Sequence, residues 1–97
     1  MPKGYWIAAY HKIHDAEKFA AYLKLAGPAI EAGGGTFLTR GMAAKAYEAG
    51  ILQRTTIIEF ESLDAALAVH DGPNYAKAIE SLGGAVTRDL RFIEGFK

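Results

Sequence analysis

Two segments of the sequence carry apolar or aromatic side chains on both faces that an extended chain would present. Residues 4–11 read GYWIAAYH, and residues 54–60 read RTTIIEF. Successive side chains of a strand point to opposite faces of a sheet, so Trp6 faces away from Tyr5 and Ile7. A strand with one face in water alternates with polar residues instead. Both segments are therefore predicted to be strands of a sheet that is covered on both faces.

A helical pattern follows the first of these strands. From Asp15, which is the predicted N-cap, apolar residues recur every three or four positions. Proline has no amide hydrogen and crowds the preceding turn, so Gly27-Pro28 predicts a kink or a restart of the helix. The glycines at 33–35 predict its end. The apolar positions are Phe19, Leu23, Ala26 and Ile30.

The remaining segments complete the order β-α-β-β-α-β, which predicts an α+β, ferredoxin-like fold with an antiparallel sheet. Ser62 is predicted to cap the helix that follows the central strand. Asp71-Gly72-Pro73 then separates two short helices, because glycine and proline break helical patterns. The segments are a strand at 36–40, a weaker extended segment at 43–48 whose alanines would equally suit a helix, the strand at 54–60, helices at 63–70 and 75–82, and a last strand at 90–96.

The length of the chain bears on its assembly. Ninety-seven residues suffice for a single domain, 1–97, with one hydrophobic core. The helices of so short a chain are too few to cover both faces of the sheet. A second copy that packs sheet against sheet would cover the other face, and two-fold dimers are the commonest oligomers. We therefore expect a homodimer.

Composition excludes several classes of function. Eleven basic residues balance eleven acidic ones without a polybasic run, so neither nucleic acid nor a membrane surface is an expected partner. The absence of cysteine excludes disulfides, thiolate nucleophiles and cysteine-bound metals. The three histidines form no metal-binding pattern, so no metal site and no cofactor are expected. No apolar run approaches the roughly 20 residues of a membrane span, which favours a soluble, cytoplasmic protein.

Two side chains are candidates for acid–base chemistry. His70 ends a predicted helix, and histidine is the side chain that titrates near neutral pH. Stabilisation of the negative end of that helix is the alternative role. Glu59 lies in the most apolar strand, where its carboxylate either faces a cavity or forms a salt bridge to Arg54 or Arg91. His70 and Glu59 are the predicted catalytic residues.

Four further residues are predicted to bind a ligand. Arg40 and Arg88 carry guanidinium groups, whose planar forks match a carboxylate, and surface charge is the alternative for each. Asn74 and Tyr75 would donate hydrogen bonds among apolar walls, as is typical of small-molecule pockets. The predicted pocket lies between the sheet and the helices.

Five blocks along the chain carry a resemblance to a known family. They read GYWIA from Gly4, LAGPAIEAGGGTFLTRG from Leu25, IIEFESLDAALA from Ile57, GPNYAKA from Gly72 and RDLRFIEG from Arg88. With these blocks the chain resembles the family called domain of unknown function 1330. Its members are similar to the dimeric α+β barrel superfamily, in which two ferredoxin-like units pack their sheets into one barrel. The resemblance thus implies the same fold and dimer as the strand pattern.

The family resemblance does not supply an activity. The superfamily includes cofactor-independent monooxygenases, isomerases, cyclases, haem-binding enzymes and regulatory modules, and a shared fold does not choose among them. This chain also departs from the family pattern at four positions. Val69-His70 replaces an aromatic pair, Asn74 replaces an acidic residue, and Leu82 replaces an arginine. An anionic ligand would therefore depend on Arg88 or Arg40.

Two functions follow as alternatives. The first is a cofactor-independent enzyme or binder of a small organic molecule. The second is a non-catalytic dimeric module with a structural or regulatory role. A cavity lined by converging polar groups favours the first, whereas a sheet interior filled by Trp6, Tyr10, Ile58 and Phe60 favours the second.

Overall fold

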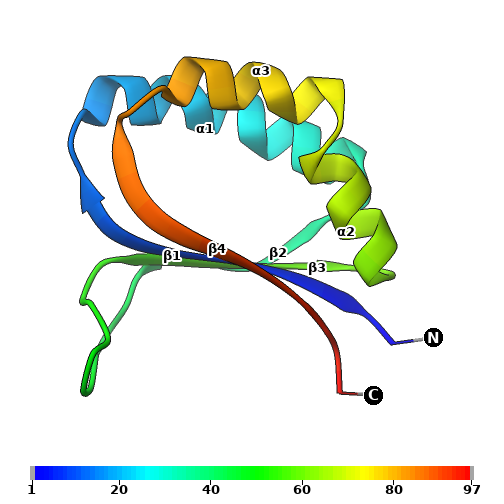
Figure 1. Ribbon diagram of the computed structural model, residues 1–97, viewed down its shortest axis with the longest axis horizontal. Coiled ribbons are helices and arrows are strands. Elements are labelled where there is room, and N and C mark those ends of the chain that lie inside the picture. The colour runs from blue at the N-terminus through cyan, green and yellow to red at the C-terminus, as the bar shows by residue number, and fades with distance from the viewer. Residues whose placement is uncertain (1, 97) are drawn as a thin grey trace.

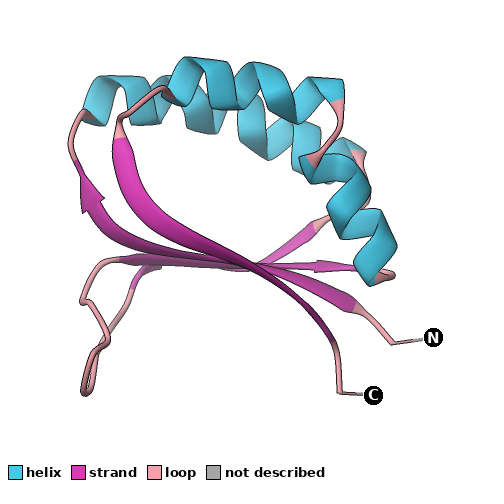
Figure 2. Ribbon diagram, in the orientation of Figure 1, coloured by secondary structure: helices cyan, strands magenta, loops and turns pink. Residues whose placement is uncertain are grey.

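The structure is a computed structural model that describes residues 2–96. Four strands form one antiparallel sheet in the order β2-β3-β1-β4, and three helices lie on one face of it (Figures 1 and 2). The predicted α+β, ferredoxin-like order is confirmed. The elements are β1 (Gly4–Ile13), α1 (Ala16–Ala32), β2 (Thr36–Met42), β3 (Arg54–Phe60), α2 (Leu63–His70), α3 (Pro73–Leu82) and β4 (Val86–Glu94).

Helix α1 begins where its N-cap was predicted. The carboxylate of Asp15 accepts hydrogen bonds from the amides of Glu17 and Lys18, both at 3.1 Å. The helix then continues through Pro28 to Ala32, so the predicted restart is wrong. Proline removes one backbone hydrogen bond, and the buried face of the helix compensates by packing on the sheet. That face consists of Phe19, Tyr22, Ala26, Gly27 and Ile30.

The segment between β2 and β3 forms a loop, so the extended segment predicted at 43–48 is wrong. At one end of the sheet the loop projects to the side away from the helices (green in Figure 1). Only its base is tied to the ladder, where the amide of Ala43 donates to the carbonyl of Gln53 at 3.0 Å. Tyr47 at the loop is 74% exposed. The small alanines of this segment bury too little apolar area to hold a further strand against the sheet.

The strand register places side chains in rows across the helix-covered face. Thr55 pairs with Ala9, so the residue before it, Arg54, lies opposite Tyr10. The side chains of Arg54 and Tyr10 both point to the covered face. The first row is Phe37, Ile58, Trp6 and Phe92; the second is Arg40, Thr56, Ala8 and Leu90; the third is Arg54, Tyr10 and Arg88. Large apolar residues thus fill one row, small residues lie at the centre of the next, and two arginines flank a tyrosine in the third.

The core lies between the sheet and the helices. Its largest fully buried side chains are Trp6, Tyr75, Phe60 and Ile58. The indole ring of Trp6 is 4.8 Å from the Tyr75 ring and 5.0 Å from the Phe92 ring, measured between centroids. These contacts join α3 to β1 and to the edge strand β4, and they place Trp6 in the core.

The opposite face of the sheet is not covered by a helix (Figure 1). Tyr5, Ile7 and Ile57 are half-buried there, and Ile93 is 56% exposed. This face is therefore apolar at its centre, as the strand pattern predicted. Within the described part of the chain, no helix has the length and hydrophobicity that crossing a membrane requires.

Candidate functional site

A pocket opens between helix α1 and the covered face of the sheet. Its floor is formed by Ala8 and Thr56, whose small side chains leave space below the helix. Gly27 lies above the floor on α1, and Trp6 and Ile58 form an apolar wall. The cavity volume is about 30 Å³, within about 390 Å³ of empty space that includes open solvent. The pocket is thus small and mainly apolar at the row that contains Trp6.

Polar groups converge at the other end of the pocket. Nη1 of Arg88 donates hydrogen bonds to the hydroxyl oxygens of Tyr10 at 2.9 Å and Tyr22 at 3.1 Å. Nη2 donates to the hydroxyl of Tyr75 at 3.2 Å. The hydroxyls of Tyr22 and Tyr75 are 2.7 Å apart and share a hydrogen bond. Residues from β1, α1, α3 and β4 therefore meet at one guanidinium group.

Three arginines line this pocket, namely Arg40, Arg54 and Arg88. Among residues 2–96, no aspartate or glutamate lines the pocket, and no ion pair joins these three arginines to a carboxylate. Arg40 is exposed at the edge, with its guanidinium carbon 4.5 Å from the centre of the Phe37 ring. The pocket consequently carries positive charge, and the described residues around it supply no anion that would balance this charge.

Burial governs the titration of the tyrosines at this end. Burial raises the pKa of the Tyr22 phenol far above its ordinary value, and Tyr75 beside it raises the pKa further. Burial also raises the pKa of Tyr10, although the charge of Arg88 offsets part of that rise. Both phenols therefore keep their protons at neutral pH and act as hydrogen-bond donors or acceptors without charge.

The raised pKa values of Tyr10 and Tyr22 predict a loss of stability in alkali. Tyrosines of the unfolded chain ionise near pH 10, whereas these two retain their protons in the folded state. Below about pH 9 the free energy of unfolding should be unaffected, and above pH 10 it should fall by up to ~1.4 kcal/mol per pH unit for each group. Urea unfolding between these pH values measures the slope.

The Tyr22→Phe variant is the control for this prediction, because it removes one of the two phenols. Its free energy of unfolding should fall less steeply above pH 10 than that of the parent protein. Equal slopes in the two proteins would contradict the assignment of Tyr22 as a buried phenol that keeps its proton.

The two predicted catalytic residues lie outside this pocket. His70 at the end of α2 packs against the rings of Trp6, Tyr75 and Phe92, and its Nδ1 is 3.0 Å from an Asp71 carboxylate oxygen. It is thus a half-buried part of the aromatic core. Glu59 lies on the opposite face of the sheet from the pocket. The structure therefore does not bring His70 and Glu59 together, and their catalytic role stays a prediction.

Glu59 has a different partner from the ones considered in the sequence. Its carboxylate accepts a hydrogen bond from the Tyr5 hydroxyl at 3.0 Å, and this bond is the main cause that raises the pKa of the Tyr5 phenol. Arg54 points to the other face of the sheet, and Arg91 pairs with Asp89 instead. The expected salt bridge from Glu59 to Arg54 or Arg91 is therefore wrong.

The predicted ligand-binding residues separate into two groups. Arg40 and Arg88 line the pocket, and Tyr75 reaches its polar end through the hydrogen bonds of its hydroxyl. Asn74 is exposed at the first turn of α3 and, together with Tyr75, lines a separate hollow between α1 and the α2–α3 junction. The structure thus places Arg40 and Arg88 in the pocket and Tyr75 between the two hollows, and it leaves Asn74 away from the pocket.

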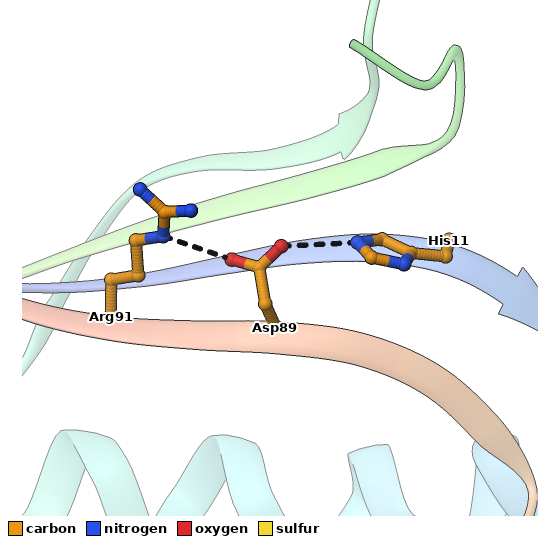
Figure 3. Close-up of polar contacts among 3 residues, drawn as sticks. All are labelled: His11, Asp89 and Arg91. Atoms are coloured by element: carbon orange, nitrogen blue, oxygen red, sulfur yellow. Dashed lines mark hydrogen bonds and ion pairs between the residues drawn. The ribbon is translucent and has the colours of Figure 1, made fainter. Parts of the chain in front are cut away.

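A second polar cluster lies on the uncovered face of the sheet (Figure 3). Nε2 of His11 is 3.0 Å from one oxygen of Asp89, and Nε of Arg91 is 3.3 Å from the other. All three side chains are substantially exposed, and exposed ion pairs contribute little to stability. Across residues 2–96, no group of three histidine, aspartate or glutamate side chains is placed to hold a metal ion.

Sequence reasoning missed two residues of the pocket, because Arg54 was considered only as an ion-pair partner and Tyr22 was not singled out. Tyr10 was considered both as a hydroxyl donor of a pocket and as a core residue. The signal for Arg54 and Tyr10 is their position in one cross-strand row with Arg88, which depends on the register. Tyr22 follows Phe19 by about one helical turn, so the helical spacing could have predicted that Tyr22 lies on the buried face of α1.

The family described as Domain of unknown function (DUF1330) matches residues 3–96. Among curated proteins, no sequence matches the chain. A solved protein of unknown function from Rhodopseudomonas palustris is similar, with 20% identity and a TM-score of 0.77 over 99% of this chain and 84% of that one.

Two further solved structures share the fold at lower similarity. SnoaB, a cofactor-independent oxygenase from Streptomyces nogalater, has 9% identity and a TM-score of 0.70, covering 100% of this chain and 96% of that one. A dimeric ferredoxin-like protein of unknown function from Thermobifida fusca has 17% identity and a TM-score of 0.63, covering 96% and 91%. At such identities the likeness shows a common fold.

Proposed function

We propose that this chain, which belongs to the DUF1330 family, binds a small organic molecule in the pocket between its sheet and its helices. The observation that carries the proposal is the composition of that pocket. Three arginines, a buried threonine and the phenols of Tyr10 and Tyr22 line a hollow whose remaining walls are mainly apolar. Placing guanidinium groups beside apolar walls without a counter-charge costs free energy. A ligand that supplies hydrogen-bond acceptors recovers that cost.

Catalysis without a cofactor is the second candidate. SnoaB, which has this fold, is a cofactor-independent oxygenase. The protonated phenols of Tyr10 and Tyr22 and the Arg88 guanidinium form a donor-rich group at one end of the pocket. Such a group stabilises negative charge that develops on a bound substrate. In this version of the proposal, His70 and Glu59 stay predicted catalytic residues, and neither lines the pocket.

The proposal includes a homodimer in the cytoplasm. The uncovered sheet face is apolar at Ile7 and Ile57, and a second copy packed on it would remove that area from water. A protein of this fold from Thermobifida fusca is described as dimeric. The pocket lies on the opposite side of the sheet from this face, so each subunit of the dimer would keep its own pocket.

Gly27 offers a way to close the pocket without disturbing the fold. Apart from its two chain neighbours, a Cβ atom added there would meet Nη1 of Arg40, at 3.8 Å, so a larger side chain has room to grow into the hollow. Glycine within a helix is less favourable than other residues by about 0.5–1 kcal/mol, but Pro28 disfavours a helical conformation for a preceding residue that carries a Cβ. We expect Gly27→Leu to fold with a stability near that of the parent protein and to lose ligand binding.

Native mass spectrometry of freshly purified protein tests the proposal. The expected spectrum shows a dimer that carries a defined small-molecule adduct in the parent protein and no adduct in Gly27→Leu. Ala20→Leu introduces the same leucine side chain at an exposed position of α1 and should retain the adduct. A bare dimer for all three proteins would favour the non-catalytic module, and a monomer would refute the sheet-to-sheet assembly.

A further inference from the structure

We infer that the ligand of this pocket is a short carboxylate of about two to four carbon atoms, held by Arg54 together with Arg88. The inference rests on the proposed function and specifies the class of molecule that the pocket takes. Three features of the described residues lead to it, namely an unpartnered group on Arg54, an excess of hydrogen-bond donors and the size of the cavity.

Arg54 carries the most specific sign of a missing partner. Its Nε is buried and, within residues 2–96, has no hydrogen-bond acceptor. The guanidinium carbon is 5.4 Å from the centre of the Phe19 ring, so an aromatic ring from α1 covers part of it. A buried N–H of a charged group is costly to leave unpaired. Because Nε is closed even to water, a ligand oxygen reaches it only when the Arg54 side chain turns toward the pocket that it lines.

Hydrogen-bond donors exceed acceptors at this end of the pocket. The hydroxyl oxygen of Tyr10 is occupied by the donor Arg88, and its own proton has no acceptor within the part of the chain that the structure describes. The Tyr22 and Tyr75 hydroxyls share one bond, which leaves the proton of one of them available. These hydroxyls, Arg54 and Arg88 are all donors, so the ligand group that binds them must accept hydrogen bonds and donate none. An ionised carboxylate has two such oxygens.

The cavity limits the rest of the ligand. Its volume is about 30 Å³, and one water molecule needs roughly 10–15 Å³ by the same measure. Trp6 and Ile58 form the apolar wall beyond the Ala8–Thr56 floor, which suits a short alkyl group and offers no further donors. A phosphate has more charge to satisfy and would leave oxygens against this wall. The cavity therefore favours a short-chain carboxylate over a phosphate or a large acid.

Matched titrations test the inference, with propionate as the probe and propionamide as its neutral counterpart of the same shape. Chemical shifts of the Trp6 indole report occupation of the pocket. Propionate is expected to bind the parent protein at least tenfold more tightly than propionamide does. Arg54→Met should weaken propionate binding at least tenfold, whereas Arg91→Met, on the uncovered face, should leave it unchanged.

The outcomes separate this inference from the proposed function. Equal binding of propionate and propionamide would overturn the carboxylate and leave the pocket in place. Tighter binding of inorganic phosphate than of propionate would overturn it in favour of another anion. If propionate does not bind while native mass spectrometry still shows an adduct that Gly27→Leu removes, the ligand class is wrong and the proposed function stands. No adduct and no propionate binding would overturn both.

Discussion

Replacing Trp6 with alanine is expected to lower the free energy of unfolding by about 3–5 kcal/mol, the cost of removing a large aromatic side chain from a core. Trp6 is 1% exposed and packs against Phe60, His70, Tyr75 and Phe92. The cavity left behind would remove the contacts of β1 with His70 of α2 and Tyr75 of α3. Part of the apolar wall of the pocket would also be lost.

Thermal and urea unfolding of Trp6→Ala at one fixed protein concentration measure this effect, since the stability of the proposed dimer would depend on concentration. The melting temperature should fall on the order of 20 °C for a domain of this size. Tyr47→Ala removes another aromatic ring, 74% exposed in the loop before β3, and should change the melting temperature little. A loss below about 1 kcal/mol for Trp6→Ala would contradict the described core.

Arg88→Met is expected to reduce stability and ligand binding together. Methionine fills a similar space without donors, so the Tyr10 hydroxyl loses its partner and the Tyr22–Tyr75 pair loses two hydrogen bonds. Tyr22 and Tyr75 still bond to each other, and removing a partly buried charge recovers some solvation free energy. The net loss should be about 2 kcal/mol. Propionate binding should weaken at least tenfold, as in Arg54→Met.

Arg91→Met is the matched control for Arg88→Met. It makes the same change in the same strand, at a side chain that is 77% exposed on the other face of the sheet. Urea unfolding should show a change of less than about 0.5 kcal/mol. If the two variants lost equal stability, the Arg88 guanidinium would not be the centre of the tyrosine cluster.

Most of the fold could be predicted from local sequence because its periodic segments are strong. Residues 54–60 form β3 and residues 63–70 form α2 with the predicted bounds, and Ser62 caps α2 by accepting from the amide of Ala65 at 3.1 Å. The errors fall where tertiary contacts decide. Helix α1 passes through Pro28 because its packing on the sheet outweighs one lost hydrogen bond, which no local rule on proline includes.

The candidate site was harder to predict, because it forms between residues that are far apart in the sequence. Arg88 was recognised as an anion-binding candidate from its chemistry alone. Only the register of β1 with β3 and β4 shows that Tyr10 and Arg54 lie in the same cross-strand row as Arg88. For Glu59 the local sequence was misleading. The apolar strand around it suggested a buried carboxylate, whereas its side chain lies on the uncovered face and bonds to Tyr5.

The central claim is that Arg54 and Arg88 hold a carboxylate in the pocket between the sheet and the helices. The most direct test is a propionate titration of nitrogen-labelled protein that follows the arginine Nε–H signals, assigned with the methionine variants. We predict that the Arg54 and Arg88 signals shift and saturate at the same propionate concentration while the Arg91 signal stays in place. Unmoved Arg54 and Arg88 signals, or an Arg91 signal that moves equally with them, would contradict the account.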